Sequence, residues 1–149
     1  AFLVKKNFDK ILAYDDLSEY IQSVAVAIEI IDSRYENFKF SLEDVIADNC
    51  SSAGYTIGEW KDFTTPVRGI GISLSVDDAT IHEGNSDAIL GNPYESLFAI
   101  SRLALLNGED IVAGDIILAG AATPAVYIEK GQSIMANAEG LGGVRLNVG

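Results

Sequence analysis

The stretch of sequence that decides the fold reads Val24-Ala-Val-Ala-Ile-Glu-Ile-Ile-Asp-Ser-Arg34. Its apolar run is too short to cross a bilayer and is rich in β-branched residues, which favours a buried strand over residues 24–32. Successive side chains of a strand point to opposite faces. One face then carries Val24, Val26, Ile28 and Ile30, and the other carries Ala25, Ala27, Glu29 and Ile31.

Glu29 places a carboxylate in the middle of this predicted strand, on the face that also carries Ala25 and Ala27, whose small side chains leave open space. A buried carboxylate is costly unless it is paired or coordinates a metal ion. Two interpretations are open on the residues alone. Glu29 is either a functional group, such as a metal ligand, or one half of a salt bridge to Arg34 or Arg68.

Shorter elements are expected on both sides of this stretch. A short helix capped by Asp15 or Asp16 should bury Leu17, Tyr20 and Ile21. Ser41 followed by Asp44 resembles a capping box that opens a helix through Ile46. Strands are predicted over residues 1–5, 54–58, 67–76, 79–82, 115–119, 125–129, 133–138 and 143–148, with a hairpin turn at Asp77-Asp78.

The clearest helix signal lies between Asn92 and Gly108. Asn92 is the expected N-cap, Pro93 suits the first helical position, and Gly108 is typical of a helix end. The apolar residues recur at helical spacing and predict a buried stripe of Leu97, Ile100, Leu103 and Ala104.

These elements predict a single catalytic-type domain over residues 1–149. The expected class is α+β, with a mixed, mostly antiparallel β-sandwich or barrel-like core and a few flanking helices. The short strands make such a closure more consistent with the sequence than a doubly wound sheet.

Composition excludes several classes of function. The formal net charge is −12, from 22 acidic and 10 basic residues, and no basic patch is present for nucleic acid or an anionic membrane surface. Cys50 is the single cysteine, which excludes an intrachain disulfide and suits a cytoplasmic setting. It is expected to be a packed thiol rather than a nucleophile. A lone His82 argues against zinc, whereas Mg²⁺ suits the available carboxylates.

Two further stretches combine small and polar residues. The first, Ala47-Asp-Asn-Cys-Ser-Ser52, is typical of a turn or helix cap, although it can also surround a small anionic substrate. The second runs from Ala113-Gly-Asp115 to Thr123, and Gly120 within it permits a close approach of a neighbouring strand or a ligand.

Together these stretches resemble one known family. The segments Ala27–Arg34, Ile46–Ser52, Gly91-Asn-Pro93, Ala113–Thr123 and Gly140–Arg145 occur in the order found in the hydratase/decarboxylase branch of the fumarylacetoacetate hydrolase superfamily. The resemblance covers essentially the whole chain.

This resemblance implies a Mg²⁺ or Mn²⁺ site held by a Glu-x-Glu pair and a third glutamate, which Glu29 matches. The pair would precede Ala1 and is absent, so the chain is expected to be the C-terminal portion of a longer protein. The resemblance also implies catalytic roles for Asn49, Ser51 and Ser52, and substrate-binding roles for Asp48 and Thr123.

The implied activity is that of a lyase of catechol meta-cleavage degradation. The first candidate adds water to 2-hydroxypenta-2,4-dienoate to give 4-hydroxy-2-oxopentanoate, and the alternative is 4-oxalocrotonate decarboxylation. Cys50 and Gly54-Tyr55 resemble hydratases, whereas Tyr35-Glu-Asn-Phe38 resembles decarboxylases. A non-catalytic structural subunit is the alternative of another class. The expected partners are a small 2-oxo or 2-hydroxy acid, other copies in a homo-oligomer, and possible association with a related enzyme.

Overall fold

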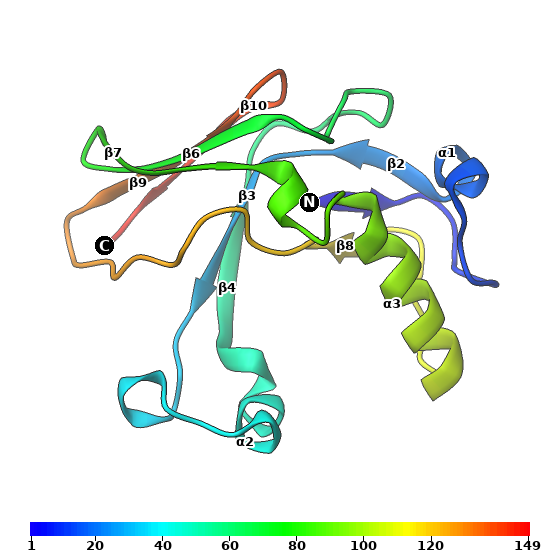
Figure 1. Ribbon diagram of the computed structural model, residues 1–149, viewed down its shortest axis with the longest axis horizontal. Helices are drawn as coiled ribbons and strands as arrows, with labels where there is room; N and C mark the ends of the chain where they lie inside the picture. Colours follow the sequence, from blue (N-terminus) through cyan, green and yellow to red (C-terminus); the bar gives the residue numbers. More distant parts are fainter.

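The computed structural model describes residues 1–149 and contains three antiparallel sheets (Figure 1). The first has the strand order β5-β2-β1-β8, the second β10-β9-β6-β7, and the third pairs β3 with β4. The strands are β1 (Phe2–Val4), β2 (Ile21–Val24), β3 (Ala27–Ile31), β4 (Ser52–Ile57), β5 (Lys61–Asp62), β6 (Gly71–Val76), β7 (Ala79–Asn85), β8 (Ile116–Ile117), β9 (Ser133–Ala138) and β10 (Gly142–Asn147).

Three α-helices accompany the sheets: α1 (Leu17–Tyr20), α2 (Leu42–Ala47) and α3 (Tyr94–Asn107). Short 3₁₀ turns occupy Tyr14–Asp16, Glu36–Phe38, Asn49–Ser51 and Ser86–Ala88. The predicted α+β class, with antiparallel sheets and few helices, is therefore confirmed. No helix is both long and apolar enough to be a candidate membrane span.

The stretch over residues 24–34 forms two strands in different sheets, so the prediction of one buried strand was wrong. β2 ends at Val24, and the buried residues Ala25 and Val26 lead into β3. The amide of Gly58, just after β4, donates to the Val26 carbonyl at 2.9 Å. This bond extends the β3–β4 pairing by one residue into the link between β2 and β3. β3 has a hydrogen-bonded neighbour, β4, on one side only. Glu29 is exposed instead of buried.

Local signals in the sequence produced the turns and caps that they predicted. Asp77 and Asp78 connect β6 to β7 with φ values of 48° and 66°, as expected for a tight turn between twisted strands. Ser41 caps α2, and its hydroxyl and the Asp44 carboxylate exchange hydrogen bonds with each other's backbone amides. Helix α3 ends at Gly108, whose φ of 70° is left-handed.

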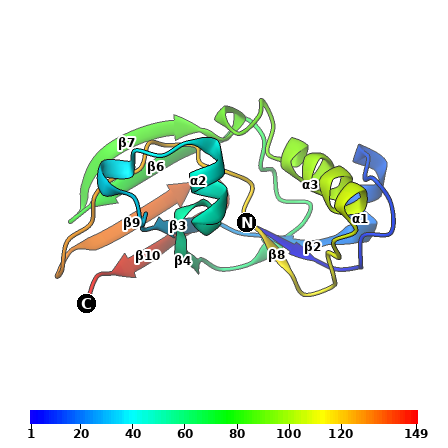
Figure 2. The same cartoon turned by 90° about the horizontal axis from the view of Figure 1, so that it is seen from below.

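Helix α3 buries a narrower stripe than its sequence predicted. Leu97 and Ala104 are buried, but Leu103 is 52% exposed, which contradicts its predicted place in the core. Asn92 caps through its side chain, which accepts the Tyr94 amide at 3.1 Å, although the boundary residue is Pro93. Figure 2 shows α3 lying over one side of the β1, β2 and β8 strands, so only its inward side is covered.

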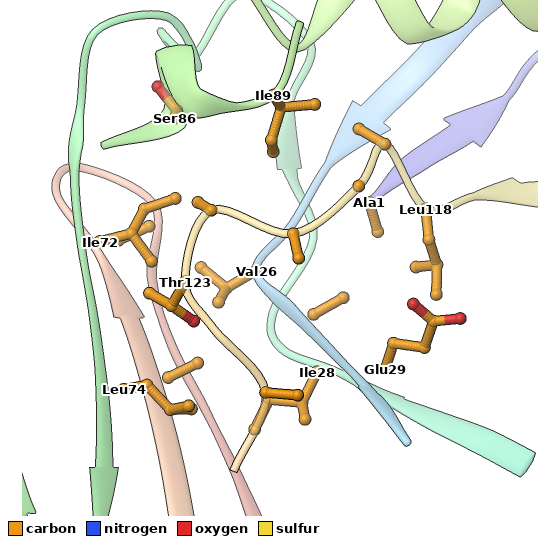
Figure 3. A pocket seen from close by; sticks show the side chains of 18 of the residues that line it. Ala1, Val26, Ile28, Glu29, Ile72, Leu74, Ser86, Ile89, Leu118 and Thr123 are labelled. Atoms are coloured by element: carbon orange, nitrogen blue, oxygen red, sulfur yellow. The ribbon is translucent and has the colours of Figure 1, made fainter. Parts of the chain in front are cut away.

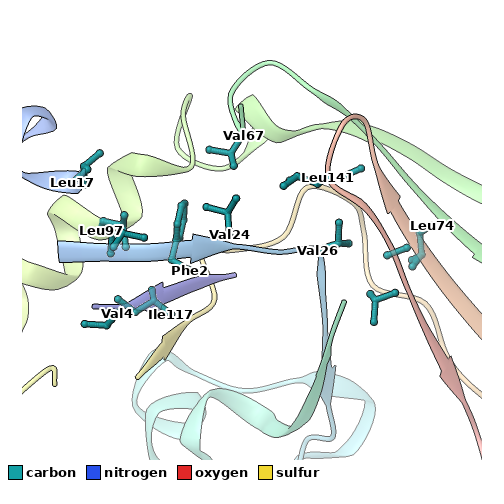
Figure 4. Packing of buried hydrophobic residues seen from close by; sticks show 14 of the residues in the cluster. Phe2, Val4, Leu17, Val24, Val26, Val67, Leu74, Leu97, Ile117 and Leu141 are labelled. Atoms are coloured by element: carbon teal, nitrogen blue, oxygen red, sulfur yellow. The ribbon is translucent and has the colours of Figure 1, made fainter. Parts of the chain in front are cut away.

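One apolar core connects the first two sheets (Figure 4). At one end, Leu97 of α3 packs with Phe2 and Val24 of the first sheet. At the other end, Val26 lies next to Leu74 and the strands of the second sheet. Alternation along β9 buries Ile134, Ala136 and Ala138 against this core.

Two segments lie outside this packed body or lack regular structure. The β3–β4 ribbon projects away from the sheets and carries α2 at its tip (Figure 1). Residues 118–129, which include a predicted strand over 125–129, form no strand. None of these residues pairs with a neighbouring strand. They run alongside the cavity described in the next subsection.

The buried position of Leu97 makes a prediction about stability. Leu97 is fully buried in the core, so the Leu97→Ala variant should lose about 2–5 kcal/mol of unfolding free energy in urea titrations. Leu105→Ala on the same helix is the control, because Leu105 is exposed and its replacement should cost less than about 0.5 kcal/mol. Equal losses in the two variants would contradict the packing described here.

Candidate functional site

A cavity of about 370 Å³ opens between β3, the inner faces of β6 and β9, and the irregular segment over residues 118–126 (Figure 3). Its wall is mostly aliphatic. Four residues with polar side chains lie along that wall: Glu29, Ser73, Ser86 and Thr123. An apolar hollow with few polar groups is typical of a small-molecule site.

Small residues allow the irregular segment to form this wall. A Cβ atom on Gly84 of β7 would lie 2.2 Å from the Ala122 carbonyl oxygen, so the close passage of the two backbones requires glycine there. Gly120 has a φ of 133° and approaches the Ile89 side chain. The Ser96 hydroxyl of α3 donates to the Ala119 carbonyl at 2.6 Å and fixes the segment to the helix. The predicted close approach at Gly120 is therefore made to protein.

Glu29 lies at one end of the cavity, beside Leu118 and apart from Thr123 (Figure 3). It forms no salt bridge with Arg34 or Arg68, so the structural alternative considered for it is wrong. Strand pairing sets Glu29 opposite Tyr55 of β4. A carboxylate with no charged partner at the rim of an apolar hollow remains available to a ligand.

The residues of this chain do not by themselves complete a metal site. No group of three or more His, Cys, Asp or Glu side chains is placed to hold a metal ion. Mg²⁺ and Mn²⁺ prefer several oxygen ligands in a near-octahedral arrangement. Glu29 is the sole carboxylate in the cavity wall, so it can supply one ligand of such a set.

Asp48 forms a hydrogen-bonded cluster at the other end of the β3–β4 ribbon. It is 3% exposed. Its carboxylate accepts the Arg34 amide at 3.0 Å and the Arg34 guanidinium at 2.5 Å, and the hydroxyls of Ser33 and Ser51 at 3.3 and 3.1 Å. The Arg34 amide, followed by its guanidinium and the Ser51 hydroxyl, lowers the pKa of Asp48 from its ordinary value, although burial acts in the opposite direction.

This cluster holds an unusual turn. Asn49, Cys50 and Ser51 have φ values of 51°, 54° and 58°, a left-handed conformation that residues other than glycine rarely adopt. The turn persists because the surrounding hydrogen bonds determine it, including the Asp32 amide bonded to the Ser51 carbonyl at 2.8 Å. Cys50 is exposed at this turn, so the prediction that its thiol is packed was wrong.

The structure thus separates the predicted site residues into two groups. Glu29 and Thr123 both line the cavity. Asp48, Asn49, Ser51 and Ser52 lie around the ribbon tip and do not line it. Asp48 and Ser51 are buried and bonded to each other, whereas Asn49 and Ser52 are exposed. The predicted turn explains the buried, hydrogen-bonded positions of Asp48 and Ser51. Contacts between these four residues and a substrate stay predictions.

Sequence reasoning missed Ser73 and Ser86 in the cavity wall. Ser86 is buried, and its hydroxyl accepts the Ile70 amide at 3.1 Å, so its visible role is to hold the loop after β7. Ser73 stands between two aliphatic residues of β6. Strand alternation gave no signal for Ser73, because it places this side chain on the face opposite Ile72 and Leu74, which also line the cavity.

An antiparallel β-structure with an apolar side cavity and a free carboxylate defines a class of small-molecule-binding domain. Within that class, the chain belongs to the fumarylacetoacetate (FAA) hydrolase C-terminal family, whose model matches residues 1–149. The resemblance drawn from the sequence motifs is thereby confirmed.

Relatives within the family carry two different names. A 4-oxalocrotonate decarboxylase of Pseudomonas sp is 49% identical over 122 residues, covering 82% of this chain and 48% of the relative. The 2-keto-4-pentenoate hydratase 1 of Dechloromonas aromatica (strain RCB) is 33% identical over 138 residues, covering 88% and 51%. The chain therefore spans about half the length of these relatives.

A solved structure shares the fold closely. The 4-oxalocrotonate decarboxylase from Pseudomonas putida G7, complexed with magnesium and adipate, matches with a TM-score of 0.88 at 31% identity. The match covers 99% of this chain and 57% of that one. Its similarity extends over the projecting β3–β4 ribbon as well as the packed body.

The Asp48 cluster predicts a pH-dependent contribution to stability. The folded-state pKa of Asp48 lies below the unfolded value of about 3.9, so the contribution is present above that pH and is lost as the pH falls through the folded-state pKa. Asp48→Asn should therefore lower the urea midpoint at neutral pH and make it less sensitive to acid. The control Asp32→Asn changes an exposed carboxylate of the same ribbon, and equal behaviour of the two variants would contradict this role.

Proposed function

We propose that the chain is the C-terminal catalytic part of a divalent-metal-dependent lyase that acts on a small unsaturated 2-oxo acid in catechol meta-cleavage degradation. The observation that carries this proposal is the apolar cavity whose single carboxylate, Glu29, has no partner within the chain. Family membership supports the same class of chemistry.

Decarboxylation of 4-oxalocrotonate is the first candidate reaction. The 49% identity to a named decarboxylase supports it, as does the TM-score of 0.88. The decarboxylase of that structure is complexed with adipate, a six-carbon dicarboxylate of the same chain length as 4-oxalocrotonate. We therefore place decarboxylation before hydration, whereas the sequence motifs alone slightly favoured the hydratase.

Hydration of 2-hydroxypenta-2,4-dienoate is the second candidate. Named hydratases with 33% identity support it, together with the hydratase-like Cys50 and Gly54-Tyr55. Both reactions use a substrate with a carboxylate beside a 2-oxo or 2-enol oxygen. The same cavity therefore suits either substrate. The two reactions differ in the bond that is broken or formed at the end of the substrate away from that carboxylate.

Glu29 is proposed as one ligand of a Mg²⁺ or Mn²⁺ ion, with the remaining ligands supplied from outside residues 1–149. An oxygen ligand suits both hard cations. Thr123 is the proposed hydrogen-bond donor to the acid substrate, because its side chain reaches the same cavity.

The residues at the tip of the β3–β4 ribbon have two different proposed roles, which are contact with the substrate and support of the turn. Asn49 and Ser52 are exposed and free to contact a substrate brought against the ribbon, whereas Asp48 and Ser51 hold the turn that carries them. We place the protein in the cytoplasm and expect copies of it to associate, alone or with a related enzyme of the family.

Metal binding tests the assignment of Glu29. Calorimetric titration of Mn²⁺ in the presence of oxalate, a mimic of the 2-oxo acid, uses a protein that contains this chain together with the segment that supplies the other ligands. Glu29→Gln should weaken binding at least about tenfold, since the variant loses a charged oxygen ligand. Glu83→Gln, which changes an exposed carboxylate on β7, is the matched control. Binding that is equal in the parent and Glu29→Gln chains would remove Glu29 from the metal site.

Product analysis separates the candidate reactions. Release of CO₂ from 4-oxalocrotonate supports the decarboxylase, and formation of 4-hydroxy-2-oxopentanoate from 2-hydroxypenta-2,4-dienoate supports the hydratase. The assay uses a protein that contains this chain together with the segment that supplies the other metal ligands, and turnover of neither acid by that protein with Mg²⁺ or Mn²⁺ present would favour the non-catalytic subunit.

A further inference from the structure

The irregular stretch over residues 118–128, which includes one wall of the cavity, is held by very few polar contacts. None of its backbone amides or carbonyls bonds to another backbone group. Its one hydrogen bond comes from the Ser96 hydroxyl, which donates to the Ala119 carbonyl at 2.6 Å. No residue of the stretch is buried, so water can satisfy the remaining backbone groups. The position of this cavity wall therefore depends on a small number of contacts.

Ser96 connects this stretch to a well-packed part of the fold. It belongs to the first turn of α3 and precedes Leu97, which is fully buried in the core. Serine side chains in helices often bond the backbone of their own helix. Ser96 instead donates to a carbonyl that lies 23 residues further along the chain. Its hydroxyl thus joins a helix that the core fixes to a segment that has no other hydrogen bond.

A second contact fixes the stretch by shape, where Ala122 and Thr123 pass Gly84 of β7. A Cβ atom on Gly84 would lie 2.2 Å from the Ala122 carbonyl oxygen and 3.3 Å from the Thr123 methyl group. The Thr123 methyl group therefore lies on the side of β7, and the side chain lines the cavity (Figure 3). Since the stretch has only the bond from Ser96, the Thr123 hydroxyl is free to meet a ligand.

We propose that Ser96 is a positioning residue for the acid ligand. Its bond to the Ala119 carbonyl, together with the close passage at Gly84, holds the segment so that Thr123 presents its hydroxyl to the cavity. This inference rests on the proposed function, because Thr123 is the group that Ser96 serves. Without the bond, the segment adopts further positions, and a smaller fraction of molecules has Thr123 in place. The apparent dissociation constant for an acid rises as that fraction falls.

Limited proteolysis tests whether Ser96 holds the segment. All measurements use a protein that contains this chain together with the segment that supplies the other metal ligands. Elastase, whose specificity pocket accepts small side chains, should cleave among the alanines of residues 119–125, and mass spectrometry assigns the cut. Ser96→Ala should raise the rate of this cleavage at least about fivefold, because loosely held surface segments are preferred sites of nicking.

Two further variants control this measurement. Ser96→Thr keeps a hydroxyl donor and should return the cleavage rate to within about twofold of the parent. Asn107→Ala also removes a hydrogen bond from α3, but that bond goes to the Leu103 carbonyl of the same helix. It should leave cleavage of the segment unchanged.

Adipate binding tests whether Ser96 acts through Thr123. Adipate is the acid that accompanies magnesium in the structure of the relative, and it is titrated calorimetrically with Mg²⁺ present. Ser96→Ala and Thr123→Val should each weaken adipate binding at least about fivefold, since each removes the hydroxyl from its place beside the ligand. In the double variant S96A/T123V, the Ser96 change should add less than about twofold, because nothing remains for it to position. A merely structural loss would weaken binding by the same factor in both backgrounds.

Gly84→Ala tests the second contact. The added methyl group has to displace the Ala122 carbonyl, so this variant should also weaken adipate binding at least about fivefold. Gly71→Ala on β6 is the matched control, because its Cβ atom would come no closer than 3.8 Å to the Glu139 side chain. It should leave the affinity unchanged. Circular dichroism verifies that every variant is folded.

Three results would overturn the positioning role of Ser96 alone. They are unchanged cleavage of residues 119–125 in Ser96→Ala, unchanged adipate binding in that variant, and an undiminished loss when Ser96→Ala is added to Thr123→Val. Adipate binding that Thr123→Val leaves unchanged would remove Thr123 from the ligand site, and the role of Ser96 with it. Absence of adipate binding in the parent would overturn the proposed function as well. The cleavage result is read without any ligand, so a failure at Ser96 is distinguished from a failure of the site.

Discussion

The structure depends on the passage of the backbone from β2 to β3 through Ala25 and Val26. This link is buried where the two larger sheets meet, and its neighbours on both sides belong to different sheets. The Ala25 amide donates to the Ala1 carbonyl at 3.0 Å and the Gly58 amide to the Val26 carbonyl at 2.9 Å. Because buried backbone groups need partners, these bonds permit the change of direction inside the core. The ribbon and the cavity both take their positions from it.

The sequence predicted best those features that depend on a few neighbouring residues. The Ser41 capping box, the Asp77-Asp78 turn and the helix end at Gly108 each contain their own conformational cause. Burial of Glu29 and Leu103 was predicted wrongly, because it depends on which distant segment covers each side chain. The side chain of Glu29 and the outward side of α3 have no such cover, and nothing in the local periodicity distinguishes a covered face from an uncovered one.

The candidate site shows the same division. The cavity positions of Glu29 and Thr123 followed a family resemblance across distant motifs, since no local pattern joins β3 to residues 118–126. Turn chemistry, in contrast, was readable in the residues before Ser52, and Asp48 with Ser51 uses it. Polar residues of one motif can therefore serve two purposes, with some fixing a strained turn and others remaining exposed on it.

The one-sided pairing of β3 gives Glu29 a second consequence. An unpaired strand edge with apolar side chains is a template on which other chains can add strands and form insoluble polymers. Glu29 is the only charge among the five residues of β3, and a central charge of this kind is a common protection against such growth. Glu29, the proposed metal ligand, is therefore also the charge that would oppose such strand addition.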